Sequence, residues 1–216
     1  MTVIQALGAF VVAAGLLTIT PGLDTAMVLR TAAVEGPRRA VLAAVGVALG
    51  CLVWGLAVAF GLGVLLTAST VAYTALKWAG AAYLVWLGAG MILKPRQGFD
   101  FEAPLQTDLA PKSRWAFAGR NWFVRGLMTN LLNPKVGVFY ISFLPQFVPA
   151  GVAAAPFIVL LAAIHVGLGL AWFAGLITAT RPLKRWLSRG AVVRWLDRVT
   201  GGVFLAFGLK LALDRR

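Results

Sequence analysis

The sequence of 216 residues contains one cysteine, Cys51, and one histidine, His165. A single thiol cannot form an intramolecular disulfide or a CxxC redox pair, and one imidazole with one thiol is too few for a zinc or transition-metal centre. Charge is also scarce, since 12% of the residues are charged against about 25% in globular proteins. Thiol redox chemistry and zinc catalysis are therefore excluded, and no cofactor or metal site is predicted.

Apolar residues dominate the chain: 60% are hydrophobic and the mean hydropathy is +0.86. Its 20 basic and 7 acidic residues cannot supply the charged surface of a soluble fold of this size. Strands of an outer-membrane barrel would alternate polar and apolar positions, whereas residues 40–50 are apolar on every side. The composition therefore predicts an all-α membrane protein.

Gaps between charged residues locate the membrane spans, because a helix needs about 20 largely uncharged residues to cross the hydrocarbon. They predict a single domain covering residues 1–216 with six transmembrane helices, at about residues 3–30, 40–67, 71–93, 122–148, 156–179 and 195–213. Residues 95–121 form the longest loop. Met1–Gln5 carries no basic residue before the first apolar run, so we expect this span to be retained rather than cleaved as a signal peptide.

Basic residues are distributed unevenly over the loops. Fifteen of the 20 lie in the loops after helices 1, 3 and 5, four lie on the other side, and Lys135 lies inside a span. The positive-inside rule then places these three loops in the cytoplasm and both termini outside. The net charge of +13 is therefore interpreted as a topology signal that involves membrane lipids, and not as a nucleic-acid interface.

Two proline motifs lie 113 residues apart, Pro21-Gly22 in the first span and Pro134-Lys135 in the fourth. Each is followed by a glycine-rich span that contains tryptophan. Because each half holds three helices, this similarity between the halves predicts two inverted three-helix repeats, a plan common in secondary transporters. Chance similarity of apolar spans is the alternative. Proline leaves the carbonyl four residues back without its partner, so helices 1 and 4 are predicted to be broken.

Polar side chains of the spans gather around these prolines. An ionised group within the bilayer costs at least about 2.5–3.5 kcal/mol, so Asp24 and Lys135 need a partner, water or a function. A carboxylate suits an ammonium ligand, and a lysine beside opened helix ends suits a carboxylate, which together fit a zwitterion. Asp24 is also a candidate proton carrier. The candidate substrate-binding or coupling residues are Pro21, Gly22, Asp24, Thr25, Asn130, Asn133, Pro134 and Lys135.

A structural explanation of the two charges stays open beside the functional one. Asp24 would then cap the half-helix that restarts after Pro21-Gly22, and Lys135 would pair with Asp24 or extend toward the headgroups. Beside the proline motifs there is no cluster of acid, base and nucleophile that a membrane enzyme would need, so the chain is predicted not to be an enzyme.

Several segments resemble the LysE/RhtB family of amino-acid exporters, and the resemblance runs nearly end to end. The segments that carry it are Pro21-Gly22-Leu23-Asp24, residues 46–54, residues 76–88, residues 126–135, residues 143–147 and residues 197–202. Residues 126–135, GLMTNLLNPK, are the most specific match. One departure matters: Leu23 stands where the family motif has a second proline, so the first break is expected to be milder and to differ in geometry.

Membership of that family implies six spans, a bacterial inner-membrane location, and export of amino acids or close derivatives driven by an ion gradient. With the bias of the basic residues, both termini are then predicted to be periplasmic. Family membership also points to Pro21, Gly22, Asp24 and to Asn133, Pro134, Lys135 as functional residues. A metal-ion exporter on a related six-helix plan and a non-transport membrane scaffold are the alternatives. The sequence leaves open which amino acid is carried, whether the coupling ion is a proton, the stoichiometry, and whether the chain forms a homo-oligomer.

Overall fold

The computed structural model describes residues 2–68, 70–97, 121–187 and 189–213, and these residues form helices and turns with no strand among them. Most of the predicted loop at 95–121 lies outside the described residues, as does Ser69. In chain order the helices are α1 (Val3–Ile19), α2 (Leu23–Val34), α3 (Pro37–Ala68), α4 (Thr70–Leu93), α6 (Trp122–Leu131), α7 (Pro134–Phe143), η2 (Leu144–Phe147), α8 (Ala154–Thr178), α9 (Thr180–Leu187) and α10 (Gly190–Leu213).

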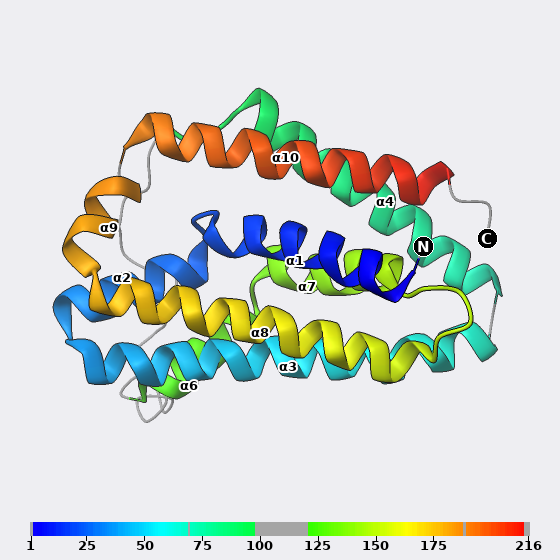
Figure 1. The fold of residues 1–216 in the computed structure, drawn as a ribbon, viewed down its shortest axis with the longest axis horizontal. Helices are drawn as coiled ribbons and strands as arrows, with labels where there is room; N and C mark the ends of the chain where they lie inside the picture. Colours follow the sequence, from blue (N-terminus) through cyan, green and yellow to red (C-terminus); the bar gives the residue numbers. More distant parts are fainter. Residues whose placement is uncertain (1, 69, 98–120, 188, 214–216) are drawn as a thin grey trace, which may run out of the picture.

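The long helices lie roughly along one axis of the molecule (Figure 1). α3 packs against α6 and α8, while α4 packs along α10. The start of α1 and the end of α10 lie at one end of the bundle, and the connections α2–α3 and α8–α9–α10 lie at the other (Figure 1). The structure thus groups at one end the connections after the first and fifth predicted spans, which are rich in lysine and arginine.

Among the residues that the structure describes, two helices are long and apolar enough to cross a membrane, with qualifying segments Pro37–Gly61 and Ala154–Thr178. The helices α1 and α2 meet the same test together, bent by 52° at their break. A shorter apolar segment is Lys77–Leu93 in α4. The described residues therefore agree with the predicted all-α membrane protein, while the number of six spans stays a prediction.

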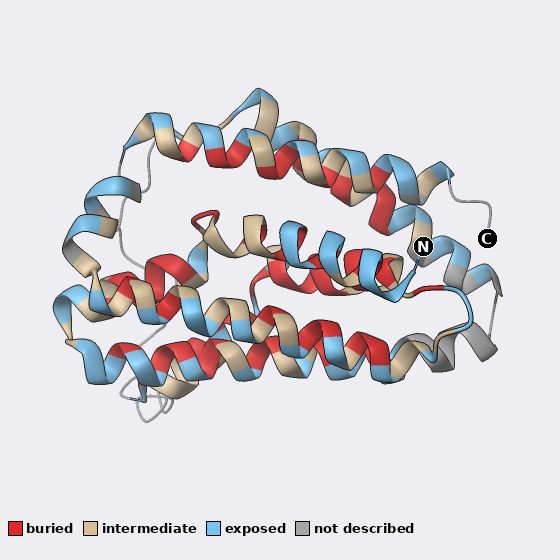
Figure 2. Cartoon of the chain, viewed as in Figure 1, coloured by how far each residue is buried: buried red, intermediate tan, exposed pale blue. Residues whose placement is uncertain are grey.

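The outer faces of the helices are exposed, as their pale-blue colour shows (Figure 2), and many of the exposed residues are large hydrophobic ones. Phe60 is 66% exposed and Trp86 is 69% exposed, which suits contact with lipid rather than with water. Inside, the largest cluster gathers aromatic side chains of α7 and its neighbours, including Phe10, Phe139 and Phe147. The interior is therefore packed while the outside remains apolar, as expected in a bilayer.

Glycine lets pairs of helices approach closely. A Cβ atom on Gly46 of α3 would collide with the backbone of Phe123 in α6, and one on Gly126 of α6 would collide with the backbone of Ala43. The α4–α10 pair has the same feature, since a Cβ on Gly201 would lie 2.7 Å from the carbonyl oxygen of Gly88. Without a hydrophobic force between helices in lipid, such close backbone contact is the main source of packing energy.

Candidate functional site

The first helix break has the position that its proline predicts. The backbone N–H and the hydroxyl of Thr20 both donate to the carbonyl of Leu16, at 3.1 and 2.6 Å, and so terminate α1. Pro21 has no N–H to continue the helix, and Gly22 is extended with φ −146° and ψ −172°. A new helix, α2, begins at Leu23. Leu23 in place of the family proline is thus compatible with a sharp bend, 52°.

The second break lies between α6 and α7. Asn133 caps α7, because its side-chain oxygen accepts a hydrogen bond from the backbone N–H of Lys135 at 3.1 Å. Pro134 is the first residue of α7, where its missing N–H costs nothing. The first N–H groups of α2 have no such side-chain cap, since its capping position is Gly22. The positive end of the α2 dipole therefore has no side-chain cap, and the acid in its first turn is Asp24.

Asp24 joins the two breaks. Its carboxylate accepts hydrogen bonds from the side-chain amides of Asn130, at 2.8 Å, and Asn133, at 3.4 Å. The fully buried Asn130 amide also lies 3.3 Å from the sulfur of Cys51. Because one partner is charged, the shorter of these bonds is stronger than a neutral amide contact. Asp24 does begin a half-helix, as the structural explanation expected, but it also ties α2 to both α6 and α7.

Lys135 is half-buried at the start of α7. Its ammonium nitrogen lies 3.6 Å from the position that a Cβ on Gly22 would take. Within the described part of the chain the ammonium forms no ion pair with Asp24, so the direct pair considered from the sequence is not present here. Lys135 instead lies next to the uncapped end of α2, where two positive features meet.

A cavity of about 70 Å³ lies at the two breaks, between α1, α2, α3, α7 and α8. We call it the central cavity. Its polar lining residues are Thr18, Thr20, Asp24, Thr25, Cys51, Asn133, Lys135 and His165. The Nδ1 atom of His165 lies 2.9 Å from the hydroxyl of Tyr140 on α7. Among the described residues no three histidine, cysteine, aspartate or glutamate side chains are placed to hold a metal ion.

A second and larger cavity, of about 790 Å³, lies between the α4–α10 pair and the breaks. We call it the side cavity. Its apolar wall comes mostly from α4, including Val85, Leu87 and Met91. Its charged lining residues are Lys94, Arg96, Lys135 and Asp197, and it shares Gly22, Asn133 and Lys135 with the central cavity. These three shared residues therefore stand between the two cavities.

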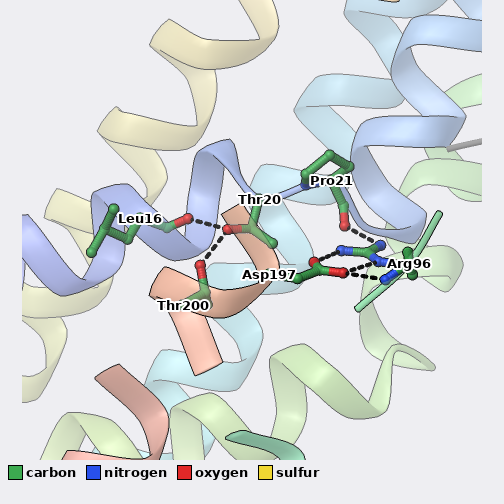
Figure 3. Close-up of polar contacts among 6 residues, drawn as sticks. All are labelled: Leu16, Thr20, Pro21, Arg96, Asp197 and Thr200. Carbon is green, nitrogen blue, oxygen red and sulfur yellow. Dashed lines mark hydrogen bonds and ion pairs between the residues drawn. The ribbon is translucent and has the colours of Figure 1, made fainter. Parts of the chain in front are cut away.

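An ion pair at the side cavity ties α10 to the first break (Figure 3). The guanidinium of Arg96 pairs with the carboxylate of Asp197, through Nε at 3.0 Å and through Nη2, and its Nη1 donates to the carbonyl of Pro21 at 2.6 Å. The Arg96 backbone N–H also donates to Asp197 at 3.0 Å. Beside this pair, the hydroxyls of Thr20 and Thr200 lie 2.5 Å apart. The carbonyl of Pro21, which lies between α1 and α2, thus has a charged partner.

The eight predicted residues are all at the breaks, although they divide between the cavities. Pro21 and Pro134 line only the side cavity, Asp24 and Thr25 line only the central one, and Asn130 reaches the site through Asp24. The sequence reasoning missed Tyr140, Arg96 and Asp197. For Asp197 a signal existed, since it is an acid inside the predicted span 195–213, and the argument applied to Asp24 holds for it as well.

Comparison with known proteins identifies the family. The profile of the LysE type translocators matches residues 16–215. The chain belongs to this family. It is therefore a membrane protein of a translocator family, as the resemblance of its motifs predicted, and the prediction that it is not an enzyme agrees with that family. No solved structure matches this LysE type translocator.

Relatives of this translocator cover nearly its whole length. A homoserine/homoserine lactone efflux protein of Salmonella typhimurium is 29% identical over 208 residues, 96% of each chain. A threonine efflux protein of Escherichia coli is 29% identical over 199 residues, 91% of this chain and 92% of the relative. The uncharacterized membrane protein YrhP of Bacillus subtilis is 27% identical over 207 residues, 95% of this chain and 98% of the relative.

Proposed function

We propose that the protein exports small neutral amino acids of the threonine and homoserine type, or close derivatives, from the cytoplasm across the bacterial inner membrane. The observation that carries the proposal is the central cavity, where an acid, a base and an open helix end meet at the two breaks. The efflux proteins named above supply the substrate class. Both termini lie outside the cytoplasm in this proposal, because the basic connections group at the opposite end of the bundle.

The substrate's two charges fit the two sides of the central cavity. The uncapped start of α2 and the ammonium of Lys135 form a positive region for a carboxylate. The carboxylate of Asp24 accepts only amide hydrogen bonds among the described residues, so it retains lone pairs for an ammonium group. A volume of about 70 Å³ is well below the roughly 300–1,000 Å³ of common ligand pockets, which favours a small substrate.

The two halves of the chain form inverted repeats in this proposal. Each half begins with a broken helix, α1–α2 or α6–α7, and continues with a long apolar helix, α3 or α8. The corresponding helices of the halves pack on each other, α3 on α8 and α4 on α10, as expected around a pseudo-twofold axis. Movement of one pair against the other would expose the breaks to either side of the membrane in turn.

Transport is driven by an ion gradient, and we assign the coupling proton to Asp24. The carboxylate lies at the break, is half-buried and lines the central cavity, so its protonation would alter the site directly. An Asp24→Asn variant removes the titrating group and keeps the shape of the side chain, with one of its two amide hydrogen bonds, because a side-chain amide has a single acceptor oxygen. If that variant remains fully proton-coupled, the assignment of the proton is wrong even though export stands.

The test of the proposal is counterflow of labelled amino acids in proteoliposomes, with threonine, homoserine, lysine and leucine, with and without a pH gradient. We expect exchange of threonine and homoserine, and stimulation by the gradient. Absence of exchange for every amino acid by correctly inserted protein would overturn the export proposal. A Lys135→Ala variant that exchanges threonine with wild-type affinity would overturn the placement of the carboxylate.

A further inference from the structure

The side cavity carries charges that the central site does not use. Three basic residues, Lys94, Arg96 and Lys135, and one acid, Asp197, line it. The cavity is therefore positive on balance. Its apolar wall comes mostly from α4, and the basic residues Lys94 and Arg96 directly follow the end of that helix. A ligand that suits it has one negative group and a small apolar portion, which describes the carboxylate and side chain of an amino acid.

Arg96 is the group best placed to receive such a carboxylate. Its guanidinium contacts both oxygens of Asp197, and a planar guanidinium binds carboxylates in this paired manner. The side chain of Arg96 is 37% exposed, whereas that of Asp197 is 2% exposed. One partner is thus accessible from the cavity while the other is held in the protein, so an incoming carboxylate can compete for the accessible one.

The Arg96–Asp197 contact lies beside the first break, close to residues that line the central cavity. Arg96 also binds the carbonyl of Pro21, and the next residue, Gly22, faces the ammonium of Lys135. Lys135 lines both cavities. A carboxylate at Arg96 therefore needs only a short transfer to reach Lys135 and the uncapped end of α2 in the central cavity.

We propose that the side cavity is an entry site for the transported amino acid. The carboxylate of the amino acid displaces Asp197 from Arg96, and the amino acid then passes to Lys135. The inference rests on the proposed export function and adds a second binding position to it. The displacement breaks one ion pair and forms another, while the 2%-exposed carboxylate of Asp197 keeps the hydrogen bond from the backbone N–H of Arg96. Asp197 acts as an internal competitor that sets how strongly the entry site binds.

The test measures equilibrium binding of labelled threonine to the full-length protein in detergent, with threonine amide as a ligand that lacks the carboxylate. The double variant Arg96→Gln/Asp197→Asn removes both charges and avoids leaving a buried carboxylate unpaired. We expect it to weaken threonine binding by about ten- to hundred-fold, the range for loss of a charged hydrogen bond, and to leave the binding of threonine amide unchanged. The single variant Asp197→Asn removes only the competitor, so we expect it to strengthen threonine binding by a few-fold.

The matched control is Glu35→Gln/Arg39→Gln, since Glu35 and Arg39 form another arginine–carboxylate pair in the chain, exposed and lining neither cavity. A purely structural pair at Arg96 would make the two test variants change affinity in the same direction, and this result would overturn the inference. So would wild-type affinity in the double variant. If the wild type itself binds and exchanges no amino acid, the export proposal fails first, so the two failures are distinguishable.

Discussion

Replacing Gly50 of α3 by alanine should displace Asn130, whose amide donates to the Asp24 carboxylate at the central cavity. A Cβ on Gly50 would lie 2.5 Å from the side-chain oxygen of Asn130 and 2.9 Å from its Cβ. Carbon atoms in contact need about 3.5–4.0 Å, so the Asn130 side chain must retreat by roughly 1 Å. Its amide is 2.8 Å from the carboxylate of Asp24, and such a shift takes that bond beyond the usual limit of about 3.2 Å.

Both stability and binding should fall in the Gly50→Ala variant. Overpacking costs about 1–3 kcal/mol, while alanine in a helix regains about 1 kcal/mol relative to glycine. The lost hydrogen bond between Asn130 and Asp24 adds about 1.5–3 kcal/mol, so the net loss of unfolding free energy is about 1.5–5 kcal/mol. The loss of this bond, worth about 1.5–3 kcal/mol, also leaves the Asp24 carboxylate less well held at the central cavity. Threonine binding should therefore weaken by about ten-fold or more.

The assay compares threonine half-saturation in proteoliposome exchange with thermal unfolding in detergent. Gly61→Ala is the control, because Gly61 is on the same helix and a Cβ there meets nothing within 4 Å. Asn130→Ala should give the binding defect without the overpacking. If Gly50→Ala matches Gly61→Ala in both assays, the coupling of the α3–α6 contact to Asp24 is wrong.

Three other substitutions probe separate contacts. Gly201→Ala should lower the unfolding midpoint by several degrees because its Cβ would press on the Gly88 carbonyl, whereas Gly202→Ala, with open space at its Cβ, should not; equal midpoints would contradict the α4–α10 packing. Thr200→Val removes the hydroxyl next to Thr20 and should cost about 1 kcal/mol, measured by chemical denaturation against Thr178→Val, whose hydroxyl bonds only its own helix. Tyr140→Phe removes the partner of His165 and should reduce threonine exchange several-fold; unchanged exchange would show that this wall of the central cavity does not position the substrate.

Proline and charge patterns predicted the breaks well, because their causes are local. Pro21 and Pro134 lack an N–H wherever the chain folds, and both helix interruptions follow directly. Asp24 and Asn133 were found for the same reason, since polar groups inside apolar segments stand out in the sequence. The predicted membrane class likewise followed from composition.

Contacts between distant segments were not predictable in this way. Arg96 and Asp197 are far apart along the chain, and nothing in either neighbourhood indicates that they pair over the carbonyl of Pro21. The expected alternative pairing of Lys135 with Asp24 is absent from the described structure, where the carboxylate accepts hydrogen bonds from Asn130 and Asn133. Tyr140 gave no signal, since an aromatic residue in an apolar helix is usually part of the core.

The sequence by itself determined that this chain is helical and membrane-embedded, where its helices break, and that Asp24 and Lys135 lie at the breaks. These properties depend on backbone hydrogen bonding and on the cost of placing charge in lipid, and both act on each segment separately. Only the tertiary structure decided which polar group meets which, and that two cavities meet at Lys135. Those features depend on the close approach of helices at Gly46, Gly50, Gly126 and Gly201, and packing of that kind is a property of segments in combination.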